Sequence, residues 1–268
     1  MPLSALADGV RRIGAGTVHA IARAGFATRF FFAVIAHSPA AFRRLQLTAR
    51  EIYFSGVLSL VVIMVSGLFV GMVLGLQGYD VLNKYGAGDS LGIFVGLSLV
   101  RELGPVVAGL LFASRAGSAV TAEIGLMKTT EQLSAMEMMA VDPLARIVAP
   151  RFWGGVISMP LLAALFSVMG VFGAYIVGVR LIGVDNGTFW GNMQAGIEFW
   201  PDITNGIVKS VVFGIAVSLI AVFEGYDAKP TAEGVSAATT RTVVGGSLAI
   251  LALDFILTVF MFRGLGNG

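Results

Sequence analysis

Residues Ile52–Tyr79 read IYFSGVLSLVVIMVSGLFVGMVLGLQGY, a stretch of 28 residues without a charged side chain. The hydrocarbon core of a bilayer is about 30 Å thick, so a spanning helix needs about 20 predominantly apolar residues. Phe152–Val179 is a second uncharged stretch of 28 residues. Both stretches are therefore predicted to cross a membrane on length alone.

Three further apolar stretches each contain an ionisable side chain. They are 90–114 with Arg101 and Glu102, 203–223 with Lys209, and 242–262 with Asp254. We predict an all-α integral membrane protein in which residues 51–268 form one domain. Its five transmembrane helices lie at about 52–79, 90–114, 152–179, 203–223 and 242–262, after an N-terminal segment 1–50.

The composition excludes several other classes of protein. Of the 268 residues, 56% are hydrophobic and 13% are charged, against about 25% charged in soluble domains. A soluble enzyme, a disordered tail and a nucleic-acid module are excluded, because none could hide so much apolar surface. The 35 glycines indicate closely packed helices. The absence of cysteine excludes disulfides and thiolate chemistry.

The distribution of basic residues predicts the orientation. Thirteen Lys and Arg residues lie in 1–50, 115–151 and 224–241, whereas the opposite loops hold three, Lys84, Arg180 and Arg263. Cytoplasmic loops carry the excess of basic residues. The N-terminus is thus predicted to be cytoplasmic and the C-terminus periplasmic.

The N-terminal segment has a weak amphipathic pattern. One helical face holds Val10, Ile13, Thr17, Ala20, Ile21 and Ala24, and the opposite face holds Arg12, His19 and Arg23. We predict an interfacial helix with its basic face towards lipid headgroups, anchored by the run Phe30, Phe31 and Phe32. A solvated basic leader is the alternative.

Small residues recur four apart in two stretches. The first set is Gly67, Gly71 and Gly75, and the second is Gly88, Gly92 and Gly96. Such spacing lets two helix backbones approach closely. The partner helix belongs either to the same subunit, the favoured interpretation, or to a neighbouring one. Pro105 and Pro160 are expected to bend their spans.

The segment 115–151 is predicted to be a cytoplasmic loop that contains one short helix at 129–140. Thr129 is suited to cap this helix, with Gln132 as its reciprocal partner. Leu133, Met136 and Ala140 share one face. This face either docks a partner or lies against the bilayer.

The charges within the spans need an explanation, because an ionised side chain at mid-bilayer costs about 3 kcal/mol. The side chains of Arg101 and Glu102 point about 100° apart on a helix, so each is expected to have its own partner residue on another helix. One interpretation is a set of structural ion pairs. The other is a polar patch in a cavity for an amphiphilic substrate, with Lys209 as a mobile cation for a phosphate.

The sequence offers no catalytic or metal-binding set. Its two histidines, His19 and His37, both lie in the N-terminal segment, and there is no H-E-x-x-H, G-x-S-x-G or P-loop motif. If the protein takes part in ATP-driven transport, a separate chain must hydrolyse the ATP.

Three motifs resemble the permease subunits of ABC transporters associated with MCE proteins, of the Mla phospholipid type. They are RELGPV at 101–106, ASRAGSAVTAEIG at 113–125 and EQLSAMEMMAVDP at 131–143. The resemblance implies a permease homodimer in the bacterial inner membrane. Its implied partners are an ABC ATPase dimer that binds ATP and Mg, a STAS-domain protein and a periplasmic hexamer of MCE proteins, with no nucleic acid and no cofactor in this chain.

The resemblance also implies the substrate and the residues involved. Phospholipid would move between the inner membrane and the periplasmic carrier, which maintains outer-membrane lipid asymmetry. Arg101, Glu102, Lys209 and Asp254 would surround the lipid cavity. The ATPase would dock on the helix 129–140, at Glu131, Leu133, Met136, Glu137 and Ala140. A scaffold that anchors MCE or STAS proteins without transport is the alternative, and a membrane-embedded lipid enzyme is a distant third.

Overall fold

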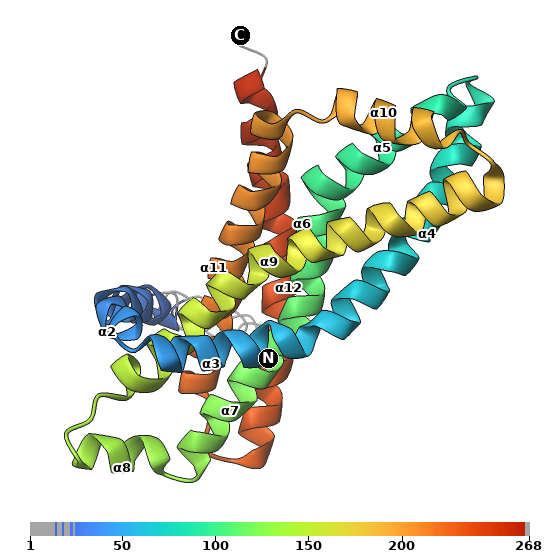
Figure 1. The fold of residues 1–268 in the computed structure, drawn as a ribbon. Coiled ribbons are helices and arrows are strands. Elements are labelled where there is room, and N and C mark those ends of the chain that lie inside the picture. The colour runs from blue at the N-terminus through green and yellow to red at the C-terminus, as the bar shows by residue number, and fades with distance from the viewer. Residues whose placement is uncertain (1–13, 15–17, 19–21, 24, 266–268) are drawn as a thin grey trace, which may run out of the picture.

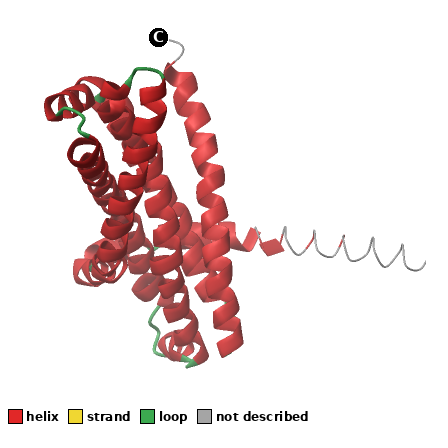
Figure 2. Ribbon diagram, turned by 90° about the vertical axis from the view of Figure 1, so that its right-hand side faces the viewer, coloured by secondary structure: helices red, strands yellow, loops and turns green. Residues whose placement is uncertain are grey.

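The computed structural model describes residues 14, 18, 22–23 and 25–265. Helix is the regular structure throughout this part of the chain (Figure 1, Figure 2). Five described segments are long and apolar enough to cross a membrane: Leu45–Lys84, Gly88–Thr129, Leu144–Ile182, Phe199–Asp227 and Ala232–Met261. The all-α membrane class and the number of candidate spans agree with the prediction, but most of the segments extend beyond the predicted bounds.

The chain before α4 (Leu60–Lys84) consists of short helices. Residues 25–36 are helical, and α2 (Ser38–Arg43) and α3 (Leu45–Ser55) follow. Of the predicted amphipathic face, Val10, Ile13, Thr17, Ala20, Ile21, Ala24, Arg12 and His19 lie outside the described residues. Phe30 is buried, with its ring 5.7 Å from that of Phe223, whereas Phe32 is exposed. Phe30 therefore anchors this segment to the protein itself.

The predicted helix 52–79 is broken near its start. It divides into α3, a short 3-10 turn at Val57–Ser59 (η1) and α4 (Leu60–Lys84), and α4 rises at an angle from the end of α3 (Figure 1). Gly56, Ser55 and Ser59 are weak helix formers. Gly56 lies close to Ser158, where a Cβ would come within 3.0 Å of the Ser158 hydroxyl. Local sequence and close packing together explain the break.

Arg115 stabilises this break from another helix. Its Nη1 donates to the carbonyl oxygen of Phe54 at 2.8 Å and to the Ser59 hydroxyl at 3.2 Å. Carbonyls at a helix end lack partners within the helix. The guanidinium supplies one, and thereby connects the break between α3 and α4 to the second span.

The second span contains two π-helical segments. It runs through α5 (Leu91–Leu97), η3 (Ser98–Leu103), α6 (Gly104–Phe112), η4 (Ala113–Gly117) and α7 (Ser118–Thr129). Pro105 lacks an N–H and disturbs the preceding turn, which is the π-helical η3. The helix is therefore locally irregular where the bend was predicted. The predicted loop 115–151 is wrong in extent, because helix continues to Thr129.

The remaining spans are long helices. η5 (Leu144–Val148), α9 (Ala149–Tyr175) and η6 (Ile176–Ile182) form the third, and α9 continues through Pro160. The fourth comprises η7 (Phe199–Ile203) and α11 (Thr204–Asp227), and the fifth is α12 (Ala232–Leu265). Figure 2 shows the helix that leads to the C-terminus at the edge of the bundle.

The glycine ladders pack within the chain. A Cβ on Gly71 would overlap the carbonyl oxygen of Gly170 in α9, and one on Gly92 would overlap that of Phe189 in α10 (Asn186–Gly196). α4 and α9 lie side by side along much of their length (Figure 1). The intrasubunit interpretation of both ladders is confirmed.

The bundle has two distinct ends. The short helix α8 (Gln132–Met138) lies at one end, and α10 lies at the other together with the C-terminal end of α12 (Figure 1). The ionisable residues of the spans lie between these ends.

Candidate functional site

Lys209 is the centre of a buried ionic cluster. Its Nζ donates to Glu102 Oε2 at 2.5 Å, to Asp254 Oδ1 at 2.9 Å and to the Thr258 hydroxyl at 2.7 Å. The three partners come from η3 and α12. An ammonium has three N–H donors, and all three are used here. Three of the four predicted charges thus meet at one point.

The burial of Lys209 corrects one part of the prediction. The residue is 1% exposed, and its donors are occupied. In this structure it does not offer a mobile cation to a lipid phosphate. The Glu102 side chain, in contrast, is 38% exposed and that of Asp254 is 23% exposed. The carboxylates are therefore the accessible groups of the cluster. Two carboxylates and one lysine give the cluster a formal charge of −1.

Arg101 lies in a different pair. Its Nε is 2.6 Å from Asp202 Oδ1, while Asp202 Oδ2 accepts the backbone N–H of Glu198 at 2.8 Å. Asp202 is buried, and sequence reasoning missed it. The available signal was its position, one residue before the predicted span 203–223. The separate partners of Arg101 and Glu102 agree with their 100° separation.

An apolar pocket lies against Leu103, which follows Glu102 in the chain. It has a volume of about 370 Å³ and is lined by α4 and by Leu103; the other lining residues are Phe69, Val70, Val73, Leu74 and Gln77. Four of these six side chains are aliphatic and one is aromatic. Such a pocket suits the apolar chain of an amphiphile.

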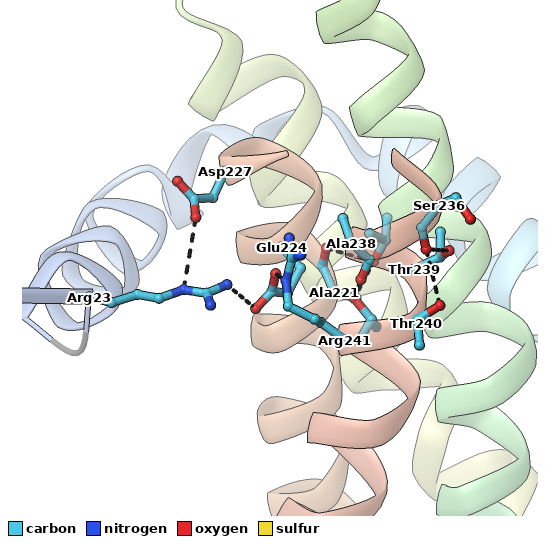
Figure 3. A network of polar contacts seen from close by, with 11 residues as sticks. Arg23, Ala221, Glu224, Asp227, Ser236, Ala238, Thr239, Thr240 and Arg241 are labelled. Atoms are coloured by element: carbon cyan, nitrogen blue, oxygen red, sulfur yellow. Dashed lines mark hydrogen bonds and ion pairs between the residues drawn. The ribbon is translucent and has the colours of Figure 1, made fainter. Parts of the chain in front are cut away.

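A second polar network holds the N-terminal helix to the end of the bundle near α8 (Figure 3). Glu224 is buried and accepts from Arg23 Nη2 at 2.6 Å and from Arg241 Nε at 2.7 Å. Arg23 Nε also lies 3.9 Å from Asp227 Oδ2. The predicted lipid-facing role of Arg23 is wrong in this structure, because its guanidinium turns towards α11. Glu224 was not predicted, although an acid at the end of an apolar span was a visible signal.

The predicted docking helix is shorter than expected and has a different cap. Thr129 ends α7, and its hydroxyl donates back to the carbonyl oxygen of Leu126 at 2.8 Å. The capping box is therefore wrong. Glu131 precedes α8 with φ of 57°, and Ala140 follows it with φ of 57°. Both residues flank the helix and do not belong to it.

The faces of α8 also differ from the prediction. Leu133 is buried and Met136 is half-buried, and both pack into the hydrophobic core. Met138 is 84% exposed, and Met139 and Glu137 are exposed as well. The surface left for a partner is thus the one that carries Met138 and Met139.

Across the described part of the chain, no three His, Asp or Glu side chains come together as a possible metal site. The polar clusters are ion pairs between helices. Five candidate spans with a buried ionic cluster between them define a helical membrane protein.

The comparisons with known proteins identify the family. The family described as Permease MlaE matches residues 48–260, and the chain belongs to it. The chain is 57% identical over 243 residues to the "Intermembrane phospholipid transport system permease protein MlaE" of Haemophilus influenzae, covering 91% of this chain and 92% of that protein. It is 38% identical over 219 residues to a probable ABC transporter permease of Rickettsia typhi, covering 82% and 84% of the two chains.

A more distant relative is a plant protein. The chain is 29% identical over 220 residues to protein TRIGALACTOSYLDIACYLGLYCEROL 1, chloroplastic, of Arabidopsis thaliana, which covers 82% of this chain and 63% of that protein. The names of the Haemophilus influenzae and Rickettsia typhi relatives describe them as permeases. The chain is accordingly a transporter subunit and not an enzyme.

Proposed function

We propose that this chain is the membrane subunit of an ATP-driven transporter that moves phospholipid between the inner membrane and a periplasmic MCE carrier, and so maintains lipid asymmetry. The observation that carries the proposal is the 57% identity, over nine-tenths of both chains, to a protein named as a phospholipid transport permease. The apolar pocket between α4 and Leu103 supports it, because a lipid presents an apolar chain.

The geometry suggests how the site handles such a substrate. An acyl chain removed from the bilayer finds an equivalent apolar surface along Phe69, Val73 and Leu103. The side chain of Glu102, the residue before Leu103, is 38% exposed and offers an accessible acceptor to an ammonium or hydroxyl group of the headgroup. Low selectivity for the chain and polar contact at one end are the properties that a phospholipid permease needs.

The proposed assembly follows the family resemblance. It comprises two copies of this permease, two ABC ATPase subunits that hold ATP and Mg, a STAS-domain protein and a hexamer of MCE proteins. The ATPase docks at α8, near the predicted residues Glu131, Leu133, Met136, Glu137 and Ala140. The exposed side chain of Met138 makes its apolar contact, since methionine adapts to irregular surfaces.

The proposed location is the bacterial inner membrane, with the N-terminus cytoplasmic and the C-terminus periplasmic. The basic asymmetry of thirteen to three supports this orientation. A reporter fused after Gly268 should report a periplasmic location, and one inserted within 228–231 should report a cytoplasmic one. The opposite result for either reporter would overturn the orientation.

The functional test uses the complete complex in liposomes. A transporter shows ATP hydrolysis that phospholipid stimulates, together with ATP-dependent movement of a labelled phospholipid to the MCE carrier. A catalytically inactive ATPase is the control and should abolish both signals. A complex that assembles but shows neither lipid stimulation nor transfer would support the scaffold alternative and overturn the proposal.

A further inference from the structure

A larger cavity lies at the α8 end of the bundle, apart from the pocket between α4 and Leu103. Its volume is about 710 Å³, and α3, α7, α8 and the beginning of α9 form its walls. Three arginines line it, Arg50, Arg146 and Arg151, together with the acids Glu51 and Glu123. The arginines exceed the acids by one formal charge, so the cavity favours an anion.

Arg151 has an incomplete set of hydrogen-bond partners. The residue is 8% exposed, and its Nη2 donates to Glu123 Oε2 at 3.1 Å. Its Nε lies 3.8 Å from Glu51 Oε2, too far for a hydrogen bond, and has no other partner among the described residues. A buried donor without an acceptor is costly. Arg151 lines the cavity and adds its positive charge to the wall, whereas its enclosed Nε is an unpaired donor within that wall.

The other two arginines are accessible. Arg50 and Arg146 are exposed, and Arg146 has no ion-pair partner in the described part of the chain. The Arg50 guanidinium lies 5.5 Å from the centre of the Phe54 ring, which limits its freedom. Guanidinium groups match phosphate oxygens in a two-point geometry. The three arginines thus provide the donors that a phosphate group requires.

The remaining wall of the cavity is largely apolar. It includes Leu126, Met127 and Met139, of which Leu126 and Met139 are exposed. A small inorganic anion gains nothing from such a wall, whereas an acyl chain does. The cavity is also walled by α3, at the start of the first candidate span, Leu45–Lys84, and so lies at the predicted level of the inner-leaflet headgroups.

We infer that this cavity binds an anionic phospholipid of the inner leaflet, with its phosphate held by Arg50, Arg146 and Arg151 and its acyl chains against the methionine and leucine wall. The bound lipid is retained and is not the transported substrate. It fills the space between α3 and α8, and therefore stabilises the position of α8 on the side that lines the cavity. The inference does not depend on transport, because binding can be measured without turnover.

The test measures lipid binding to the purified, delipidated permease by native mass spectrometry. The probes are phosphatidylglycerol and phosphatidylethanolamine, with inorganic phosphate as the competitor. Arg50→Gln with Arg146→Gln should weaken phosphatidylglycerol binding at least about tenfold, since two charged hydrogen-bond donors are lost. Both residues are exposed, so the double variant should fold normally.

Two matched controls distinguish this cavity from other lipid contacts. Arg43→Gln with Arg44→Gln removes two exposed arginines that do not line the cavity, and should leave the affinity unchanged. Val73→Trp narrows the pocket between α4 and Leu103 and should leave the affinity unchanged as well. A cavity-filling variant, Ala135→Phe, keeps all three arginines and should still weaken binding.

Four results with the purified permease would overturn the inference. The first is an equal loss of phosphatidylglycerol affinity in the two double-arginine variants, and the second is equal affinity for phosphatidylglycerol and phosphatidylethanolamine. The third is full displacement of the lipid by inorganic phosphate, and the fourth is lipid binding that Val73→Trp abolishes and the other variants leave unchanged. A cross-link from position 146 to the ATPase, together with loss of phosphatidylglycerol in the full complex, would assign the cavity to a protein partner and would also overturn it.

Discussion

Replacing Lys209 by methionine tests how the ionic cluster stabilises the bundle. The substitution keeps the length of the buried side chain but removes the cation that joins Glu102 to Asp254. Two carboxylates then share one site without a counter-charge. The variant should therefore be much less stable than one that removes a single carboxylate.

The magnitude follows from burial and charge. Removing one partner of a buried ion pair costs about 3–5 kcal/mol. Because Glu102 is 38% exposed, water screens part of its charge, and we expect about 3 kcal/mol for Lys209→Met. Glu102→Gln leaves Lys209 balanced by Asp254 and still bonded to Thr258. Its cost should be about 1 kcal/mol.

The assay is thermal unfolding of the purified permease in detergent. A loss of 3 kcal/mol should lower the midpoint by roughly 6–12 °C, and a loss of 1 kcal/mol by about 2–4 °C. The triple variant Lys209→Met, Glu102→Gln and Asp254→Asn removes every charge of the cluster, and should recover most of the loss. A midpoint for Lys209→Met no lower than that of Glu102→Gln, or a triple variant without recovery, would refute the reasoning.

The triple variant also separates the two interpretations of the cluster. If its charges only hold the helices together, a folded triple variant should still transport lipid. If the exposed carboxylate of Glu102 contacts the substrate, the triple variant should fold and fail to transport. Transfer of labelled phospholipid by the reconstituted complex measures the difference.

The other predictions concern packing, coupling and pH. Met138→Asp places a charge on the exposed face of α8 and should release the ATPase from the purified complex while the permease still inserts; retained ATPase would exclude this face. Gly71→Val should abolish folding, because its Cβ overlaps the α9 backbone. Gly191 has open space around it, so Gly191→Ala should leave the unfolding midpoint unchanged or raise it, with a gain in stability of up to about 1 kcal/mol. Arg115→Gln should lower lipid-stimulated ATP hydrolysis with little change in basal hydrolysis, and Arg115→Lys should restore part of it, because the bond across the break between α3 and α4 is weakened; equal loss of both activities would indicate general misfolding. Asp185 caps α10, and hydrogen bonds from the backbone N–H and the hydroxyl of Thr188 lower the pKa of its carboxyl group. Its contribution to the stability of the folded protein is therefore present at neutral pH and is lost as the pH falls through that lowered pKa. Asp185→Asn should remove this part of the acid dependence of the unfolding midpoint.

Several features of this protein were predictable because they depend on local sequence. Apolar length is a property of a single segment, so the candidate spans and the all-α class could be read from runs such as Ile52–Tyr79. The isolated charges at Glu102, Lys209 and Asp254 were recognised for the same reason, since an ionised group inside an apolar run is costly wherever the run packs.

The limits of the elements were less predictable. The break at Gly56 depends on the approach of α9, and the continuation of helix to Thr129 overrides a plausible cap at that residue. Local patterns for caps and turns compete with tertiary packing, and packing decided both cases. The same holds for α8, where Leu133 and Met136 face the core because the neighbouring helices provide an apolar surface there.

The partners of the charged residues were decided by the tertiary structure alone. Lys209 joins residues 107 and 45 positions away in the chain, and Arg101 pairs with Asp202, which no periodicity singled out. A sequence shows that a buried charge needs a partner, because the low dielectric of the interior penalises an unpaired one. Which residue becomes that partner depends on how the helices rotate and cross, and many side chains of different helices determine that arrangement together.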